Sequence, residues 1–278
     1  MKLIIQGQEI HTPDLKQLAK LSHASCIKNI NQQAFCLYDA QPECELDVTA
    51  YCANAALDCA FVPEDRTFAD FGLLVMDMDS TLITIECIDE IADMIGVKPQ
   101  VADITESAMQ GKIDFAESLT RRVALLEGLD ESALQRVYDE RLKLSPGAEK
   151  MLATLKQHHI KTLLVSGGFT FFTERLKAKL GLDYASANTL EISNGKLTGK
   201  VLGKILDAQG KADALNKLRN ELGLTKAQVI SMGDGANDLK MMAEAGISIA
   251  YRAKPVVREQ ATYAISHSGL DGILNLLN

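Results

Sequence analysis

Short apolar runs alternate with stretches of helical periodicity over most of the chain after residue 70. Continuous apolar runs are typical of strands that are covered on both faces of a parallel sheet. They occupy residues 71–76, 161–165, 229–232 and 247–250. Strands that alternate with helices predict an α/β fold with a doubly wound, mostly parallel, Rossmann-like sheet. Ligands bind beyond the carboxyl ends of the strands in such sheets, so polar residues at the strand exits are candidates for a functional site.

The first 70 residues have a different order of elements. Strand patterns cover residues 2–7, 26–30, 34–38 and 58–62, and helical patterns begin at residues 12 and 47. The order β-α-β-β-α-β is that of a ferredoxin-like sandwich, and it resembles the small amino-acid-sensing ACT domains. A plain docking or dimerisation module fits the pattern equally well. We therefore expect a small α+β domain at 1–70 and a core domain at 71–278, with a homodimer as one option for the assembly.

Residues 83–145 form an insertion that is too long for a simple crossover helix. Apolar residues recur at i, i+3, i+4 and i+7 from Ile88, and the pattern ends at Gly96. Further helical patterns cover 101–109 and 115–127. These features predict a helical cap at about residues 85–145, inserted after the first strand of the core.

Arg122 lies on the apolar stripe of the expected helix 115–127, whereas Arg121 points about 100° away from it. A guanidinium on an apolar stripe needs an anion. The partner is either a structural carboxylate or the carboxylate of a substrate, which arginine can bind through two parallel hydrogen bonds. Glu86 lies opposite the Ile88 stripe, and its position alone is that of a solvated acid.

Two acids, Asp77 and Asp79, follow the strand at 71–76 and are followed by two hydroxyl residues. Alternation along an extended chain would place both carboxylates on one side, where they repel unless a cation or a shared proton intervenes. Glycines flank Asp234 at another strand exit, and Asp238 follows about one helical turn later. Together these acids predict an oxygen-rich site for Mg²⁺. A polar strand-to-loop exit is the plainer alternative for Asp77 and Asp79.

Two further segments suit a phosphate group. Ser166-Gly167-Gly168 combines a hydroxyl with backbone N–H groups that no side chain screens, although a glycine turn into a helix at 170–180 explains it equally well. Lys211 begins the expected helix 211–222, where a cation opposes the helix dipole and an anionic partner would rationalise it. A solvated lysine near Asp213 is the alternative.

Composition narrows the function classes. The 278 residues carry a net charge of −8, with a pI near 5.2 and no basic block, which argues against a nucleic-acid-binding surface. No apolar run approaches the about 18 residues of a membrane span, and the first residues do not form a signal peptide, so we expect a cytoplasmic protein. The six cysteines contain no Cys-x-x-Cys pair, and we expect reduced, mostly buried thiols.

Four segments, in this order, resemble the motifs of haloacid-dehalogenase-type phosphatases. They are Asp77-Met78-Asp79-Ser80-Thr81, Ser166-Gly167-Gly168-Phe169, Lys211 and Gly233-Asp234-Gly235-Ala236-Asn237-Asp238. Within that superfamily, residues 86–90, 111–123 and 181–188 resemble the phosphoserine phosphatase family. The resemblance extends from Phe71 to the end of the chain. Residues 190–201, with Asn194-Gly195 at a turn, resemble the family's small β-hairpin.

The resemblance implies a reaction and a set of roles. Asp77 would attack phosphorus, and Asp79 would act as general acid and base. Mg²⁺ would be held by Asp77, Asp234 and the backbone carbonyl of Asp79, with Asp238 hydrogen-bonded behind them. The remaining residues would bind the substrate O-phosphoserine: Ser166, Gly167, Lys211 and Asn237 at the phosphate, Glu86 at the ammonium, Arg122 at the carboxylate, and Met109 and Phe115 along the cap.

Two other hypotheses compete with this one. The chain could hydrolyse another small phosphomonoester or pass the phosphoryl group to an alcohol, but Glu86 with Arg122 favours an amino-acid substrate. A phospho-accepting signalling receiver also combines acids, a hydroxyl and a lysine on a doubly wound sheet. Such a module has no reason to carry a cap or Asp79.

Overall fold

The computed structural model describes residues 1–277, and the chain divides into two compact units. The first unit comprises residues 1–74, 146–161 and the segment from 224 onward; the second comprises residues 75–145 and 162–223. These units differ from the two domains expected from the sequence, because the N-terminal residues cluster with the carboxyl-terminal part of the chain. The boundary expected at residue 70 stays a prediction.

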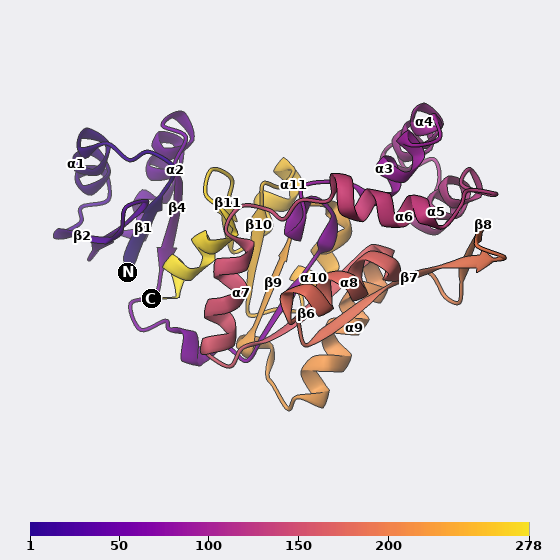
Figure 1. Cartoon of the computed structure of the whole chain (residues 1–278). Coiled ribbons are helices and arrows are strands. Elements are labelled where there is room, and N and C mark those ends of the chain that lie inside the picture. The colour runs from indigo at the N-terminus through magenta and orange to yellow at the C-terminus, as the bar shows by residue number, and fades with distance from the viewer. Residues whose placement is uncertain (278) are drawn as a thin grey trace. The chain divides into compact units, whose positions relative to one another are not determined.

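The N-terminal residues fold into a four-stranded antiparallel sheet with strand order β2-β3-β1-β4 (Figure 1). Its elements are β1 (Lys2–Gln6), α1 (Thr12–Leu21), β2 (Cys26–Asn31), β3 (Ala34–Tyr38), α2 (Glu45–Asn54) and β4 (Asp58–Val62). Apolar residues of both helices share a core with the strands, and they include Leu3, Leu15, Leu37, Val48 and Phe61. The element order β-α-β-β-α-β read from the sequence is confirmed.

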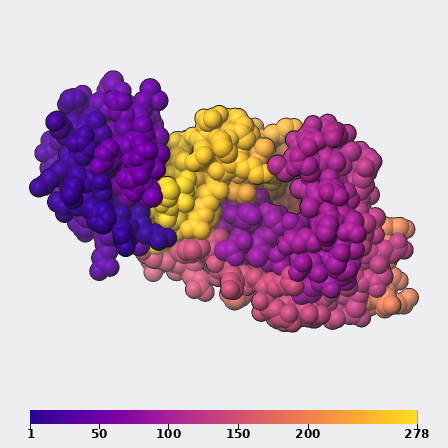
Figure 2. All heavy atoms as spheres, turned by 90° about the horizontal axis from the view of Figure 1, so that it is seen from above, coloured from indigo at the N-terminus to yellow at the C-terminus, as the bar shows by residue number. Residues whose placement is uncertain are grey.

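The carboxylate of Asp58 fastens this sheet to the carboxyl-terminal residues of the same unit. Its two oxygens accept hydrogen bonds from the backbone N–H groups of residues 266–268, at 2.7–3.1 Å. Asn275 donates to Gln6 at 2.7 Å. The indigo N-terminal residues accordingly adjoin the yellow carboxyl-terminal residues in Figure 2.

A second sheet has seven strands in the order β11-β10-β9-β5-β6-β7-β8. The strands are β5 (Leu73–Met76), β6 (Lys161–Phe169), β7 (Tyr184–Ser193), β8 (Lys196–Leu202), β9 (Val229–Gly233), β10 (Ile247–Tyr251) and β11 (Tyr263–Ile265). β6 and β7, β9 and β10, and β10 and β11 pair in parallel, whereas β7 and β8 form an antiparallel hairpin. The expected doubly wound, mostly parallel α/β core is confirmed. All four residues of β5 are fully buried, as its continuous apolar run predicted.

The remaining helices connect the strands or form the cap. They are α3 (Cys87–Asp93), α4 (Lys98–Met109), α5 (Phe115–Ala124), α6 (Ser132–Arg136), α7 (Ala148–Gln157), α8 (Thr170–Leu180), α9 (Ala208–Glu221), α10 (Leu239–Met242) and α11 (Pro255–Arg258). The segment from α3 to α6 confirms the helical insertion after β5. Its two ends pair with each other through a bridge between Ile83 and Leu144 and a hydrogen bond from Thr84 N to Lys143 O of 2.9 Å.

The β7–β8 hairpin supports the cap segment that follows α5. Leu197 N donates to Leu129 O at 2.8 Å, and Gly128 N donates to Leu197 O at 2.8 Å. Gly199, at φ +78°, lies against the end of α5, where a side chain would meet the backbone of Ala124. The hairpin turn at Asn194 and Gly195 has positive φ at both residues, as the Asn-Gly pair predicted.

Cysteine burial and helix composition add two observations. Cys36, Cys52 and Cys87 are buried, Cys44 and Cys59 are half-buried, and Cys26 is exposed, all as free thiols.

Within residues 1–277, no helix is both long enough and apolar enough to cross a bilayer.

Candidate active site

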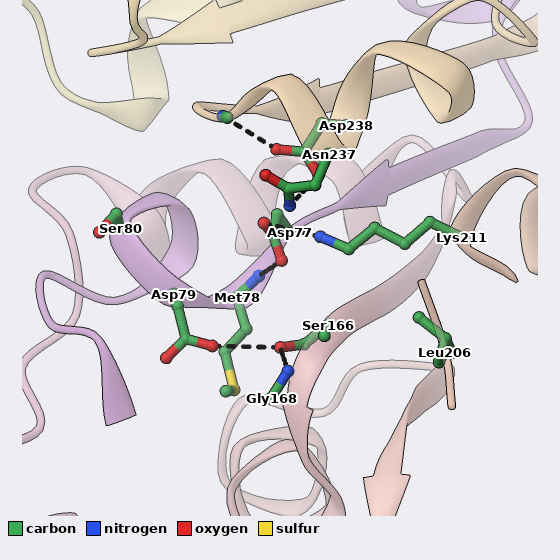
Figure 3. Close-up of polar contacts among 12 residues, drawn as sticks. Asp77, Met78, Asp79, Ser80, Ser166, Gly168, Leu206, Lys211, Asn237 and Asp238 are labelled. Carbon is green, nitrogen blue, oxygen red and sulfur yellow. Dashed lines mark hydrogen bonds and ion pairs between the residues drawn. The ribbon is translucent and has the colours of Figure 1, made fainter. Parts of the chain in front are cut away.

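The two acids, Asp77 and Asp79, follow the end of β5 and precede a tight turn at Ser80. The strand ends at Met76, and Asp77 Oδ1 accepts a hydrogen bond of 2.7 Å from Met78 N. Ser80 is left-handed, at φ 55°, and its N–H donates to Ile85 O at 3.2 Å. Asp77 and Asp79 themselves have extended backbone angles, so the left-handed turn follows both acids. Figure 3 shows the Asp77 carboxylate directed toward Lys211 and the Asp79 carboxylate directed toward Ser166.

Lys211 forms an ion pair with Asp77, with 2.8 Å between Nζ and Oδ2 (Figure 3). Its side chain is 2% exposed and that of Asp77 is 7% exposed, so the pair is shielded from water. The expected helix start at Lys211 is wrong, because α9 begins at Ala208 and Asp207 caps it by accepting from Gly210 N at 2.8 Å. The alternative of a solvated lysine is also wrong.

Asp79 is held by one backbone and one side-chain donor. Its Oδ1 accepts from Cys87 N at 2.8 Å and its Oδ2 accepts from Ser166 Oγ at 3.1 Å. Burial raises the pKa of the Asp79 carboxyl, and these hydrogen bonds oppose that rise. The carboxyl is therefore shifted toward its protonated form, as a group that donates a proton requires.

The two glycines after Ser166 lie close to the Asp79 carboxylate and to the Phe115 ring. Ser166 Oγ accepts from Gly168 N at 2.8 Å. A Cβ on Gly168 would lie 2.8 Å from Asp79 Oδ2, and one on Gly167 would lie 2.8 Å from the Phe115 ring. A side chain at either position would therefore displace the Asp79 carboxylate or the Phe115 ring.

The turn after β9 is stabilised by its own acid. Asp238 Oδ2 accepts from Gly235 N at 3.1 Å, and Asn237 Nδ2 donates to Asp238 Oδ1 at 3.4 Å. A Cβ on Gly233 would collide with the Asp238 carboxylate. Asp238 is fully buried, Asp234 is half-buried, and Asn237 is exposed. Gly233 thus leaves room for the buried carboxylate of Asp238, and Gly235 donates a hydrogen bond to it.

Three carboxylates form a group with the chemistry of a metal site. Asp77, Asp234 and Asp238 each offer an oxygen, and these oxygens lie within 4.8 Å of one another. Carboxylate oxygens are the ligands that Mg²⁺ takes in proteins, so the donor set fits this ion. The Asp79 carboxylate is not part of the group. The sequence placed Asp238 behind the metal-binding residues, and the structure brings its carboxylate among them.

The cap contributes a half-buried guanidinium. Arg122 Nε donates to Ser118 O at 3.4 Å. Burial lowers the pKa of Arg122, and the negative charges of Asp89, Glu86 and Asp79 oppose that effect. Burial likewise raises the pKa of the Asp89 carboxyl, against the charge of Arg122. No pattern in the sequence singled out Asp89, because an acid in the first turn of a helix is common on any solvated surface.

The other expected cap residues differ in burial. Glu86 is exposed, and its Oε1 accepts from Ser80 Oγ at 2.7 Å. Phe115 is half-buried and lies against Gly167. Met109 is 64% exposed at the end of α4, so nothing among the described residues covers most of its side chain.

The chain resembles known proteins over both of its sheets. The family profile of haloacid dehalogenase-like hydrolases matches residues 74–243, and that of a domain of unknown function matches residues 3–48. A phosphoserine phosphatase of Polaromonas sp. is 52% identical over 218 residues, which cover 77% of this chain and 92% of that protein.

Two solved structures match almost the whole chain. The crystal structure of a haloacid dehalogenase family hydrolase from Salmonella enterica has a TM-score of 0.91 at 34% identity, over 100% of this chain and 98% of that one. An unliganded probable phosphoserine phosphatase from Vibrio cholerae has a TM-score of 0.87 at 39% identity, over 99% of this chain and 86% of that one.

Proposed function

Because the chain belongs to the haloacid dehalogenase-like hydrolases, and to the phosphoserine phosphatases among them, we propose that it hydrolyses O-phosphoserine through a phosphoryl group carried on Asp77. The chain is therefore a phosphatase, and its relatives do not favour a signalling receiver. The observation that carries the mechanism is the division of roles between two neighbouring acids. Asp77 is paired with Lys211, whereas Asp79 is set apart with a raised pKa.

In the first step, an oxygen of Asp77 attacks phosphorus in line. A bond forms between that oxygen and phosphorus as the bond from phosphorus to the serine oxygen breaks. Lys211 and the N–H of Met78 hold the two carboxylate oxygens of Asp77, at 2.8 and 2.7 Å. The nucleophile is thus oriented before the substrate arrives, which lowers the entropic cost of reaching the transition state.

Asp79 carries the proton in both steps. It gives a proton to the serine oxygen as that oxygen departs. The resulting carboxylate then takes a proton from the water that attacks the aspartyl phosphate, which releases phosphate and restores Asp77. Support comes from burial, which favours the protonated form of Asp79, and from the donors Cys87 N and Ser166 Oγ, which stabilise its charged form.

Asp77, Asp234 and the backbone carbonyl of Asp79 would hold Mg²⁺, with Asp238 beside them. When bound, Mg²⁺ would offset the repulsion between the attacking carboxylate and the anionic phosphate. The acidic group of three carboxylates supports this assignment. Without a cation, carboxylates this close would repel each other.

The phosphate oxygens would be bound by one hydroxyl, backbone N–H groups and one amine. Ser166 and Gly167 supply the first two, and Lys211 supplies the charge. Asn237 would donate to the same group from the turn after β9.

The cap would recognise the amino acid. Arg122 would bind the substrate carboxylate, and Glu86 would bind the ammonium. Phe115 and Met109 would line the serine side. The half-burial of Arg122 on a cap helix supports this arrangement, because a guanidinium in such a place favours an anionic partner. By its reaction the protein would carry out the last step of serine biosynthesis, in the cytoplasm.

A homodimer is one option for the assembly of this protein. Light scattering of the purified protein would test it.

Phosphate release from three substrates tests this function. O-phosphoserine should be hydrolysed over many turnovers with Mg²⁺, O-phosphothreonine more slowly, and a simple alkyl phosphate most slowly. Equal rates would show that the cap does not recognise the amino-acid part of the substrate. The protein would then be a phosphatase for a broader range of small phosphomonoesters. Transfer of the phosphoryl group to an added alcohol in place of water would identify a phosphotransferase.

A further inference from the structure

Asn188 joins two backbone segments of the second unit through one side-chain amide. It is 3% exposed and lies on β7, where it pairs with Phe169 of β6. Its Nδ2 donates to Gly167 O at 2.8 Å, and its Oδ1 accepts from Leu206 N at 2.7 Å. A longer contact of 3.4 Å joins Nδ2 to Leu206 O. The amide therefore spans the distance between the glycine loop and the segment before α9.

Each of these segments leads directly to a group at the candidate active site. Gly167 lies in the loop whose Ser166 hydroxyl donates to Asp79. Leu206 precedes Asp207, which caps α9 and accepts through its backbone oxygen from Lys211 N at 2.9 Å. Lys211 then reaches Asp77 from the first turn of that helix. The position of Leu206 thus fixes where the helix that carries Lys211 begins.

We propose that Asn188 is a positioning residue that holds the Ser166–Gly168 loop and the Lys211 helix at the separation a phosphoryl group requires. This inference rests on the proposed function for its substrate, but not for its geometry. An amide suits the task because it offers a donor and an acceptor on one planar group. Aspartate at this position would lose the donor toward Gly167 O, and leucine would lose both.

The loss of either hydrogen bond would leave a backbone group of Gly167 or Leu206 without this partner in a partly buried place. Such groups recover partners by moving toward water or other donors. A shift of either segment would change the distance between the Ser166 hydroxyl and the Lys211 amine. Displacements of about 1 Å among catalytic groups cost on the order of 100-fold in rate.

Asn188→Leu and Asn188→Asp test the proposal, with orthovanadate as a probe of the phosphoryl site and L-serine as a probe of the cap. Both assays contain Mg²⁺. We expect both variants to lower the affinity for orthovanadate by about 10-fold or more and kcat by about 100-fold. The affinity for L-serine should not change, because Arg122 and Glu86 do not depend on this amide.

Thr162→Val is the matched control at the other end of the same two strands. Thr162 Oγ1 donates to Asp183 Oδ2 at 3.2 Å and accepts from Asp183 N at 3.1 Å, so the variant also loses partly buried hydrogen bonds between β6 and the residue before β7. It should lower the melting temperature while leaving orthovanadate affinity and kcat unchanged.

Three outcomes decide the proposal. If the Asn188 variants only lower the melting temperature, as the control does, Asn188 is structural and the inference is overturned. The same holds if orthovanadate and L-serine affinities fall together. If the wild-type protein does not hydrolyse O-phosphoserine but orthovanadate binding still depends on Asn188, the substrate assignment fails and the positioning role stands.

Discussion

Lys211 Nζ lies 2.8 Å from Asp77 Oδ2, and both side chains are almost completely buried. Two opposite charges in a place of low dielectric attract strongly, but each loses its hydration on burial. Removing one partner therefore takes a buried counter-charge away from the other. The pair also fixes the orientation of the nucleophile that we assign, so a change at Lys211 affects stability and catalysis together.

Lys211→Met should reduce kcat by about 100- to 1,000-fold, the range seen when one donor to a transferring or developing anion is removed. The free energy of unfolding should also fall, because the Asp77 carboxylate loses its buried partner. Steady-state phosphate release and thermal unfolding measure the two effects. Lys217→Met, on the exposed face of the same helix, is the control and should leave both values near wild type. A Lys211→Met enzyme with wild-type kcat would remove Lys211 from the mechanism.

Arg122→Ala should raise the KM for O-phosphoserine by about 10- to 100-fold, because hydrogen bonds to charged groups contribute about 1.5–3 kcal/mol. The KM for O-phosphoethanolamine, which lacks the carboxylate, should change little. The neighbouring Arg121→Ala provides the control, since Arg121 is exposed and pairs with Glu117 one turn earlier. An equal loss with both substrates would identify Arg122 as a structural residue.

Gly168→Ala should abolish most activity without unfolding the protein. A Cβ at this position would lie 2.8 Å from Asp79 Oδ2 and 3.0 Å from Ser166 Oγ, so it must displace one or both of these side chains, to which we assign proton transfer and phosphate binding. We expect a fall in kcat of about 100-fold. Gly210→Ala is the comparison, since the nearest side-chain atom to its Cβ, apart from its chain neighbours, would be Leu206 Cγ at 3.3 Å. Normal turnover by Gly168→Ala would mean that the loop adjusts freely.

The ion pairs of Arg141 should make the stability of the second unit depend on pH in the acid range. Arg141 contacts Glu90 Oε2 and Asp93 Oδ2, each at 2.6 Å. The hydrogen bond from Arg141 holds the pKa of Glu90 below its ordinary value of 4.5. A carboxyl whose pKa is lower in the folded state than in the unfolded state stabilises the protein fully above its unfolded-state pKa. This contribution is lost as pH falls through the folded-state pKa.

Arg141→Gln should therefore flatten the decline of the unfolding free energy below about pH 4.5 relative to wild type. Urea unfolding at a series of pH values measures this slope. Arg136→Gln, which breaks an exposed pair with Glu140, should leave it unchanged. Parallel curves for wild type and Arg141→Gln would exclude a contribution from this network.

The core strands and the helical cap were predictable because their residues are patterned by burial. The run that became β5 is continuous and apolar, and α8 occupies the expected residues Thr170–Leu180. The parallel part of β7, from Tyr184 to Asn188, was not predicted as a strand. Most of its residues are only half-buried, so no apolar run or strict alternation marks it.

The strand exits predicted the acids of the site but not their arrangement. Asp77 and Asp79 both have extended backbone angles, yet their carboxylates contact different partners, Lys211 and Ser166, which strand alternation does not anticipate. α9 begins at Ala208 because Asp207 caps it. The sequence did not predict this start, because Gly210 in the first turn of the helix is an unfavourable helix residue. The exposure of Met109 depends on how the cap helices pack, which single-helix periodicity does not specify.

The most direct test of the account is to trap the phosphoryl group on the protein. Wild-type enzyme mixed with O-phosphoserine and Mg²⁺, quenched with acid within one turnover and digested, should yield an Asp77-containing peptide heavier by one phosphoryl group. Asp77→Asn should bind O-phosphoserine, release no phosphate and show no such peptide, because an amide cannot attack. A phosphoryl group on any other residue, or turnover by Asp77→Asn above about 1% of wild type, would contradict the nucleophilic role of Asp77.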